Sequence, residues 1–252
     1  MKIKSILFID SGIGGLSTLV KATEQIKANC IYFADNKNSP YGKKSSVFLK
    51  NRLSEIISSV SKNYNITTVV LACNTATTSA IEYLRNRFKK LILIGTEPAS
   101  KIAIDKNFKK PAIIATPRTI KNISNNIDKK IKLIKSKNLA ALVENYYIFP
   151  SPLNNFKLIK EILKIRRQLT TNDCLVLGCT HYCLIKEKLS KFINRPLIDG
   201  NDGVSKQISK LYAFKRTNKS SVKIILSSKN SHSLKKYKKI LKQILANQIK
   251  LW

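Results

Sequence analysis

The sequence predicts an α/β protein made of two similar halves, each built on a parallel sheet, that face each other across an active-site cleft. Short apolar runs alternate with longer polar segments of helical period along the 252 residues, which is typical of strands and helices in parallel sheets. Each half also contains an apolar run followed by a small residue and a cysteine, Cys73 in one and Cys179 in the other. Because open α/β sheets build their sites at the carboxyl ends of strands, these cysteines mark matching positions.

The expected strands are short apolar runs that end at polar or glycine-rich segments, and they cover residues 5–9, 31–34, 68–72, 91–94, 112–115, 174–177 and 222–226. The expected helices cover residues 16–26, 45–64, 75–88, 158–167 and 233–247. The last helix places apolar residues on one face and lysines opposite, which favours packing on the core over lying on a membrane surface. Turn residues near 97–98 and 200–203 are the expected places where the chain crosses between its halves.

The composition is that of an ordinary globular protein, with 43% hydrophobic residues and a mean hydropathy of -0.14. No apolar run reaches the roughly 18 residues that a membrane span needs, so no membrane partner is expected. The apolar start of the chain runs directly into Asp10, which indicates a first strand rather than a signal peptide. The number of cysteines, 5, is odd, and they lie in apolar settings, which excludes a secreted disulfide framework and indicates a cytoplasmic protein.

The net charge of +33 arises from 47 basic and 14 acidic residues. A charge of this size is typical of proteins that bind nucleic acid or anionic membranes. Here, however, the lysine pairs are dispersed along the chain, no nucleic-acid motif accompanies them, and a composition rich in lysine, isoleucine and asparagine is what an AT-rich genome encodes. We therefore expect no specific nucleic-acid partner, while a polyanion-binding role remains the alternative.

Two loops are candidates for ligand contact. Asp10-Ser11-Gly12 ends the first expected strand and leads through further glycines into a helix, so its backbone N–H groups are suited to an anion. Asp10 itself fits a catalytic or orienting role, or contact with an ammonium group, and the simpler alternative is a helix cap. The Pro-Tyr-Gly turn at Tyr41 and Gly42 can present backbone amides and a phenol to a ligand, or it is a plain loop.

The two cysteines are candidate acid/base groups. A helix N-terminus lowers the pKa of a thiol from about 8.5 toward neutrality, which gives a thiolate that can accept a proton. Donors and acceptors follow each cysteine at Asn74, Thr75, Thr180 and His181. Two opposed acid/base groups are what inversion at a carbon centre requires. The alternative of a metal site at Cys179, His181 and Cys183 lacks a fourth ligand at a recognisable spacing, so no metal is expected.

Taken together, these segments resemble the glutamate racemases of the aspartate/glutamate racemase superfamily, which are cofactor-independent enzymes that make D-glutamate for peptidoglycan. The segments that match the family lie at 10–16, 40–42, 72–75, 97–99, 115–119, 142–144, 177–182 and 198–199. They occur in the family's order over nearly the whole chain. Eight segments in register make the resemblance specific where any one of them would be weak.

The resemblance implies two α/β domains, the first formed by 1–96 plus 208–252 and the second by 97–207. It implies that Cys73 and Cys179 are the catalytic thiols, that Asp10 assists Cys73, and that His181 and Glu144 assist Cys179. The residues that it implies for substrate binding are Asp10, Ser11, Tyr41, Gly42, Asn74, Thr75, Thr119, Thr180 and His181.

The implied reaction is racemisation of L-glutamate to D-glutamate without a cofactor, with glutamate as partner and with a homodimer left open. A racemase of aspartate or another amino acid is one alternative, because thiol motifs do not fix the length of the substrate's side chain. A polyanion-binding protein that keeps the racemase fold is the other. The chain departs from the family at Asn38, Cys183 and Gly200, where Arg, Pro and Ser are usual. The first departure is expected to weaken a salt bridge of the loop or an interface.

Overall fold

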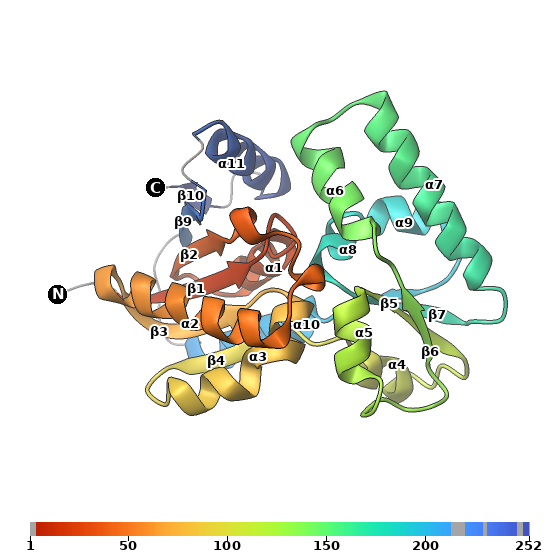
Figure 1. Cartoon of the computed structure of the whole chain (residues 1–252), viewed down its shortest axis with the longest axis horizontal. Helices are drawn as coiled ribbons and strands as arrows, with labels where there is room; N and C mark the ends of the chain where they lie inside the picture. Colours follow the sequence, from red (N-terminus) through yellow and green to blue (C-terminus); the bar gives the residue numbers. More distant parts are fainter. Residues whose placement is uncertain (1–3, 213–219, 229–230, 246–248, 252) are drawn as a thin grey trace.

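The chain folds on two parallel sheets that lie side by side (Figure 1). The computed structural model describes residues 4–212, 220–228, 231–245 and 249–251. The strand order is β10-β9-β2-β1-β3-β4 in the six-stranded sheet and β6-β5-β7-β8 in the four-stranded sheet. Every described pair of neighbouring strands is parallel. The predicted α/β fold with two parallel sheets is confirmed.

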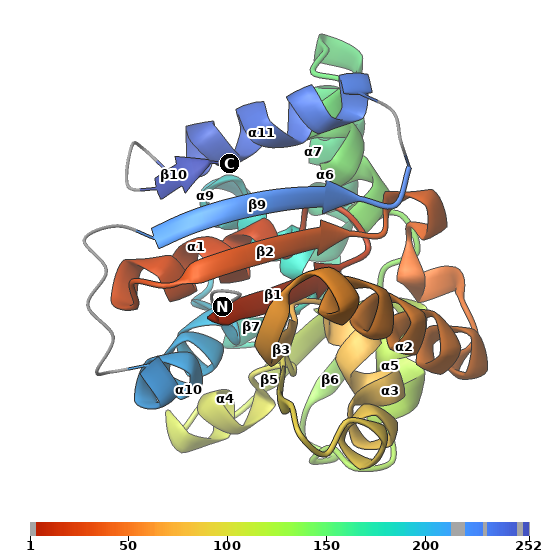
Figure 2. The same cartoon turned by 90° about the vertical axis from the view of Figure 1, so that its left-hand side faces the viewer.

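The six-stranded sheet and its helices come from both ends of the described chain. They are β1 (Lys4–Asp10), α1 (Leu16–Gln25), β2 (Asn29–Ala34), α2 (Ser46–Asn63), β3 (Asn65–Leu71), α3 (Asn74–Arg87), β4 (Ile92–Gly95), α10 (Asn201–Tyr212), β9 (Ser220–Leu226), α11 (Ser231–Leu245) and β10 (Ile249–Leu251). The 3-10 turns η1 (Asn36–Asn38) and η2 (Tyr41–Lys43) lie between β2 and α2. Figure 2 shows β9, β2 and β1 side by side, with α11 beyond β9.

The four-stranded sheet and its helices form the middle of the chain. They are α4 (Ser100–Asp105), β5 (Pro111–Ala115), α5 (Pro117–Ile123), β6 (Lys132–Lys135), α6 (Leu139–Ile148), α7 (Pro152–Gln168), β7 (Cys174–Gly178), α8 (Thr180–Leu184), α9 (Lys186–Phe192) and β8 (Leu197–Ile198). The sequence missed β6, β8, β10 and helices α4, α5, α6, α8, α9 and α10, several of which are too short for a clear period. Residues 246–247 of the last expected helix lie outside the described part of the chain.

Each sheet is covered by helices on both faces because side chains alternate along the strands. In β1, Ile6 and Phe8 pack in a cluster with α1, α10 and α11, while Leu7 and Ile9 pack with α2 and α3. The same alternation in β7 divides its side chains between a cluster with α6 to α9 and a cluster with α4 and α5. Near-continuous apolar strands are therefore buried on both faces, as parallel sheets require.

The strand orders of the two sheets indicate where a ligand site is expected. In the first sheet β1 lies between β2 and β3, and in the second β5 lies between β6 and β7, so the winding direction reverses beside β1 and β5. Ligands of open α/β sheets bind at the carboxyl ends of strands at such switch points. The segments that follow β1, β3, β5 and β7 therefore carry the candidate residues.

The two crossings between the sheets lie together. The backbone oxygen of Glu97, after β4, would lie 2.7 Å from a Cβ at Gly200, just before α10. Val204 and Ile208 of α10 pack in the core of the six-stranded sheet. We therefore propose domain boundaries near 97 and 200, so that the whole of α10 joins the first domain instead of being divided at 207–208.

Candidate active site

Asp10 ends β1 and is fully buried where the two sheets meet. Its Oδ1 accepts a hydrogen bond of 2.7 Å from the backbone N–H of Gly12, and its Oδ2 accepts one of 3.1 Å from the Thr180 hydroxyl. Burial raises the pKa of Asp10, while the nearby His181 and these donors offset the rise only in part. Asp10 can therefore hold a proton at a higher pH than an exposed carboxyl can.

Cys73 directly precedes α3 and is 6% exposed. Burial raises the pKa of this thiol, and negative charge on Asp10 and Cys179 raises it further. The backbone N–H groups of Ala76 and Thr75 lower it, but they do not outweigh burial. The helix N-terminus thus lowers the pKa of Cys73 as predicted, but burial outweighs it, so the pKa does not fall toward neutrality in this structure. The influence of Cys179 on this pKa also means that the two thiols lie close enough to interact.

Cys179 precedes α8 in the matching position and is also 6% exposed. Its Sγ lies 3.9 Å from Nδ1 of His181, and Nε2 of the same ring lies 2.6 Å from Oε2 of Glu144 on α6. Burial lowers the pKa of His181, but the hydrogen bonds to Cys179 and Glu144 outweigh it and hold the pKa well above its ordinary value. A protonated imidazole beside the sulfur is suited to exchanging a proton with it.

The glycine loop packs against this histidine and glutamate. A Cβ at Gly12 would lie 2.3 Å from Oε2 of Glu144, and a Cβ at Gly14 would lie 2.4 Å from Nδ1 of His181. Both glycines therefore leave room for side chains of the other half of the molecule. The expectation of an anion-binding loop finds less support, because the N–H of Gly12 is already bonded to Asp10.

Three buried threonines form a second contact between the two halves of the molecule. The hydroxyl of Thr75 on α3 lies 3.0 Å from those of Thr116 and Thr119, at the start of α5, and these two lie 3.1 Å apart. Gly42 completes the contact, since a Cβ there would lie 2.9 Å from Cβ of Thr116. The structure thus brings Thr75, Thr119 and Gly42 together. Thr116 belongs to the same cluster, although only the matched segment 115–119 pointed to it in the sequence.

Tyr41 is held by a buried carboxylate. Its hydroxyl donates a hydrogen bond of 2.9 Å to Oδ2 of Asp35, which also accepts from Arg52 at 3.0 Å. A second nitrogen of Arg52 lies 2.8 Å from Oδ1 of Asp35, and Asn38 donates to both carboxylate oxygens. Burial alone would raise the pKa of Asp35, but these donors lower it below its ordinary value. The loop therefore keeps a salt bridge despite Asn38, because Arg52 of α2 supplies the cation.

The remaining predicted residues lie nearby. Ser11 is buried beside Asp10, and Nδ2 of Asn74 donates a hydrogen bond of 3.0 Å to the backbone oxygen of Thr96. Sequence reasoning missed Tyr237 of α11, whose hydroxyl donates to Oε1 of Glu144 at 3.0 Å. Its only signal was membership of the apolar face of the last helix, which indicated core packing.

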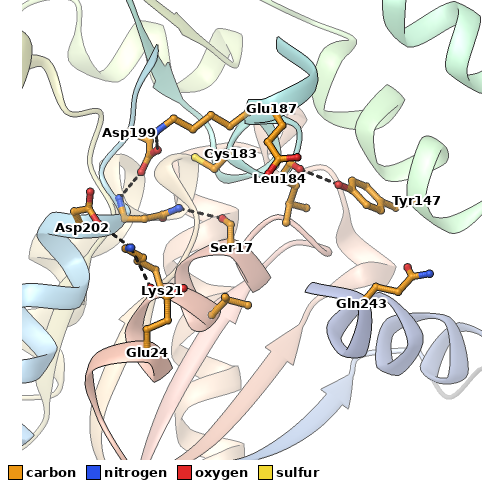
Figure 3. Close-up of a pocket in the computed structure, with 13 residues that line it drawn as sticks. Ser17, Lys21, Glu24, Tyr147, Cys183, Leu184, Glu187, Asp199, Asp202 and Gln243 are labelled. Carbon is orange, nitrogen blue, oxygen red and sulfur yellow. Dashed lines mark hydrogen bonds and ion pairs between the residues drawn. The ribbon is translucent and has the colours of Figure 1, made fainter. Parts of the chain in front are cut away.

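Figure 3 shows a separate pocket of about 660 Å³ beside α1, α8 and α11, which the side chains of Lys21, Cys183 and Gln243 help to line. It contains none of the residues predicted for the site. Ser17, which lines this pocket, donates a hydrogen bond of 3.4 Å to the backbone oxygen of Thr180, whose hydroxyl donates to Asp10. Among the described residues, no group of three or more His, Cys, Asp and Glu side chains could hold a metal ion.

Comparison with known proteins identifies the family. No protein-family model matches the chain. A glutamate racemase of Clostridium novyi is 37% identical to it, over 94% of this chain and 96% of that protein. A glutamate racemase of Buchnera aphidicola subsp. Schizaphis graminum is 34% identical, over 94% and 95% of the two chains. The chain belongs to the glutamate racemase family. The resemblance predicted from the motifs and the expectation of an enzyme are confirmed.

Solved structures of the family have the same fold. A glutamate racemase isoform from Bacillus anthracis superimposes with a TM-score of 0.80 at 22% identity, over 100% of this chain and 97% of that one. Escherichia coli glutamate racemase, in complex with L-glutamate and an activator, gives a TM-score of 0.78 at 24% identity, over 99% and 98%. Within the part of this chain that the structure describes, no helix is both long and apolar enough to span a bilayer.

Proposed function

We propose that this chain interconverts L-glutamate and D-glutamate by acid/base catalysis with Cys73 and Cys179, and thereby supplies D-glutamate for peptidoglycan. One observation carries the mechanism. Two thiols at matching strand ends are buried, Asp10 lies near enough to Cys73 to affect its pKa, and Nδ1 of His181 lies 3.9 Å from Sγ of Cys179. We assign Asp10 and His181 as the acid/base partners of Cys73 and Cys179.

The reaction needs two proton transfers on opposite faces of the α-carbon. One cysteine, as thiolate, takes the α-proton and becomes a thiol, while the electron pair of the broken C–H bond stays on the substrate as a carbanion. The opposite thiol then donates its proton to the other face and becomes the thiolate. Turnover in the reverse direction uses the same groups in exchanged roles. Because both proton donors and acceptors are on the chain, the proposal needs no cofactor.

Buried polar groups around the thiols are suited to holding an amino acid. We assign the substrate's carboxylates to the hydroxyl and amide groups around the thiols, and its ammonium to an oxygen of Asp10, which can accept a hydrogen bond. The set comprises Ser11, Tyr41, Gly42, Asn74, Thr75, Thr119, Thr180 and His181, to which the geometry adds Thr116. Donors that are fixed before the substrate binds stabilise developing charge without the cost of reorganising water.

The test is racemisation of L-glutamate and L-aspartate in heavy water. With two bases, the D-glutamate formed early carries α-deuterium while the remaining L-glutamate keeps its α-hydrogen, because the abstracting thiol does not return its proton to the same face. Mass spectrometry of the separated enantiomers measures both pools. Deuterium appearing equally fast in the remaining L-glutamate would contradict the two-base mechanism, and faster turnover of aspartate would contradict the assigned substrate.

Three further expectations belong to the same proposal. The site of action is the cytoplasm, since five cysteines in apolar settings suit a reducing compartment. The +33 charge is a property of composition, so no specific nucleic-acid partner is expected. A homodimer remains open, and sedimentation equilibrium of the purified chain would establish the oligomeric state.

A further inference from the structure

The Glu144 carboxylate is held from three sides, and one of its partners has no place in the mechanism described so far. Oε2 pairs with His181 at 2.6 Å, and the Cα of Gly12 lies too close to the carboxylate for any Cβ. Oε1 accepts a hydrogen bond of 3.0 Å from the hydroxyl of Tyr237, a side chain that is 1% exposed.

Tyr237 comes from a distant part of the chain. Its helix, α11, packs on the six-stranded sheet, whereas Glu144 and His181 lie on α6 and α8, which cover the four-stranded sheet. In Figure 1 α11 lies beside α6, and the two helices are in contact. The bond between Tyr237 and Glu144 thus joins the helix near the C-terminus to the acid/base group of the other half.

A carboxylate at the end of a flexible side chain needs more than one partner to keep a fixed orientation. Every other rotamer that stays accessible reduces the population of the rotamer that bonds to His181. The neighbouring Tyr32 cannot replace Tyr237, since its own hydroxyl donates to the backbone oxygen of Gly12 at 2.7 Å. We propose that Tyr237 is a positioning residue that fixes Glu144 against His181 and so keeps the imidazole able to exchange a proton with Cys179.

The groups that face Glu144 and His181 determine whether loss of the Tyr237 hydroxyl raises or lowers the pKa of His181. They are Asp10 on β1, Cys179 before α8, Tyr32 on β2 and Tyr237 on α11. Burial lowers the pKa of His181, and the bonds to Cys179 and Glu144 raise it. If Glu144 turns away after loss of the Tyr237 hydroxyl, His181 loses a bond that raises its pKa while burial still lowers it. The pKa of His181 must therefore fall.

The first test measures His181 directly. The chain has only 2 histidines, so NMR of ring-labelled protein can follow both, and the His232→Gln variant assigns them. Tyr237→Phe should lower the pKa of His181 toward its ordinary value of about 6.5. Glu144→Gln should lower the pKa of His181 at least as far. In the double variant, Tyr237→Phe should change this pKa little beyond the effect of Glu144→Gln alone. An unchanged titration in a folded Tyr237→Phe protein would overturn the inference, and Tyr237→Met gives a second non-donating side chain if the first variant does not fold.

The second test, which rests on the proposed function, measures turnover. The two enantiomers have equal free energy, so kcat/KM must fall equally in both directions, and a defect at one thiol appears as unequal changes in kcat and in the α-deuterium isotope effect. Tyr237→Phe should lower kcat about tenfold in one direction, less than the ~10²–10⁴ that general acid/base catalysis supplies. The affected direction should be the one that His181→Ala affects more. Equal losses in kcat in both directions would contradict the positioning role.

The matched control is Tyr212→Phe, which removes a hydroxyl that lies 2.9 Å from that of Thr67 and 2.8 Å from that of Thr68, away from the site. It should change neither the His181 titration nor the asymmetry of kcat. If the wild-type chain fails to racemise glutamate, the proposed function fails, while the NMR titration still decides the role of Tyr237.

Discussion

Replacement of Gly12 by alanine tests whether the glycine loop makes room for Glu144. The new Cβ would lie 2.3 Å from Oε2 and 2.7 Å from Oε1 of Glu144, whereas an ordinary contact begins at 3.4 Å. The carboxylate must therefore move by about 1 Å. No glycine in the described part of the chain has a positive φ, so alanine fits the backbone and the effect is steric.

That movement has a defined consequence for the acid/base group. The His181–Glu144 bond of 2.6 Å would lengthen past the limit of about 3.2 Å for a hydrogen bond of this kind. A catalytic group displaced by about 1 Å can cost ~10²-fold in rate. Because the displaced carboxylate acts through His181 rather than on the substrate, we expect a loss in kcat of about 10- to 100-fold, larger in the direction that His181→Ala affects more.

The assay is kcat in both directions with α-hydrogen and α-deuterium glutamate, together with urea unfolding to show that the variant is folded. The matched control is Gly203→Ala, because a Cβ at Gly203 would meet no heavy atom within 4 Å. Gly203 is the third residue of α10, and alanine is favoured over glycine by at most about 1 kcal/mol in a helix, so this variant should be active and no less stable. A folded Gly12→Ala protein with wild-type kcat in both directions would refute the steric argument.

Further predictions concern the thiols, the histidine, the Asp35 salt bridge and the charge. Cys73→Ser or Cys179→Ser should abolish racemisation in both directions with folding nearly unchanged, and wild-type-like turnover of either variant would remove the two-base mechanism. His181→Ala should lower kcat unequally in the two directions, by ~10 to 10⁴ in the more affected one, and equal losses would contradict the assignment of His181 to Cys179 alone. Arg52→Met should cost on the order of 3 kcal/mol of unfolding free energy in urea, because it leaves the carboxylate of Asp35 buried without its cation. Since the pKa of folded Asp35 is lowered, the wild-type contribution is present at neutral pH and is lost as the pH falls through that pKa, so a constant difference between wild type and Arg52→Met down to acid pH would contradict it. Duplex DNA should bind weakly and without sequence preference at about 0.15 M salt, where exposed charges are screened beyond ~8 Å, and strong inhibition of turnover by DNA would contradict this.

The sequence was sufficient for features that depend on neighbours along the chain. A buried strand followed by Cys73 or Cys179 and then by a helix is visible in a single short window, and so is Asp10 before its glycines. The observed ends of the predicted strands differ from the predicted ones by at most three residues, because fraying and hydrogen-bond registry decide the terminal residue.

Features that depend on distant contacts could not be read in this way. Tyr237 meets Glu144 across a separation of 93 residues, and the hydroxyl of Thr75 meets that of Thr116 across 41 residues. The replacement of a family arginine by Asn38 suggested a weakened loop, yet Arg52 supplies the cation from a different helix. The pKa of Cys73 also depends on how deeply the folded chain buries it, which a helix N-terminus in the sequence does not reveal.

The two thiols occupy matching positions but have unlike partners, and this difference bears on the pH dependence. Cys73 lies near a buried carboxyl, Asp10, whose raised pKa keeps it suited to holding a proton. Cys179 lies beside an imidazole that Glu144 keeps protonated above its ordinary pKa. Negative charge on Cys179 also raises the pKa of Cys73, so the two sites interact. The proposed mechanism requires one thiol to be charged and the other protonated, so kcat/KM should follow a bell-shaped pH profile whose two limbs belong to the pair. Glu144→Gln weakens only the partner of Cys179, and it should therefore move one limb more than the other; equal movement of both limbs would mean that the glutamate acts on the whole site and not through His181.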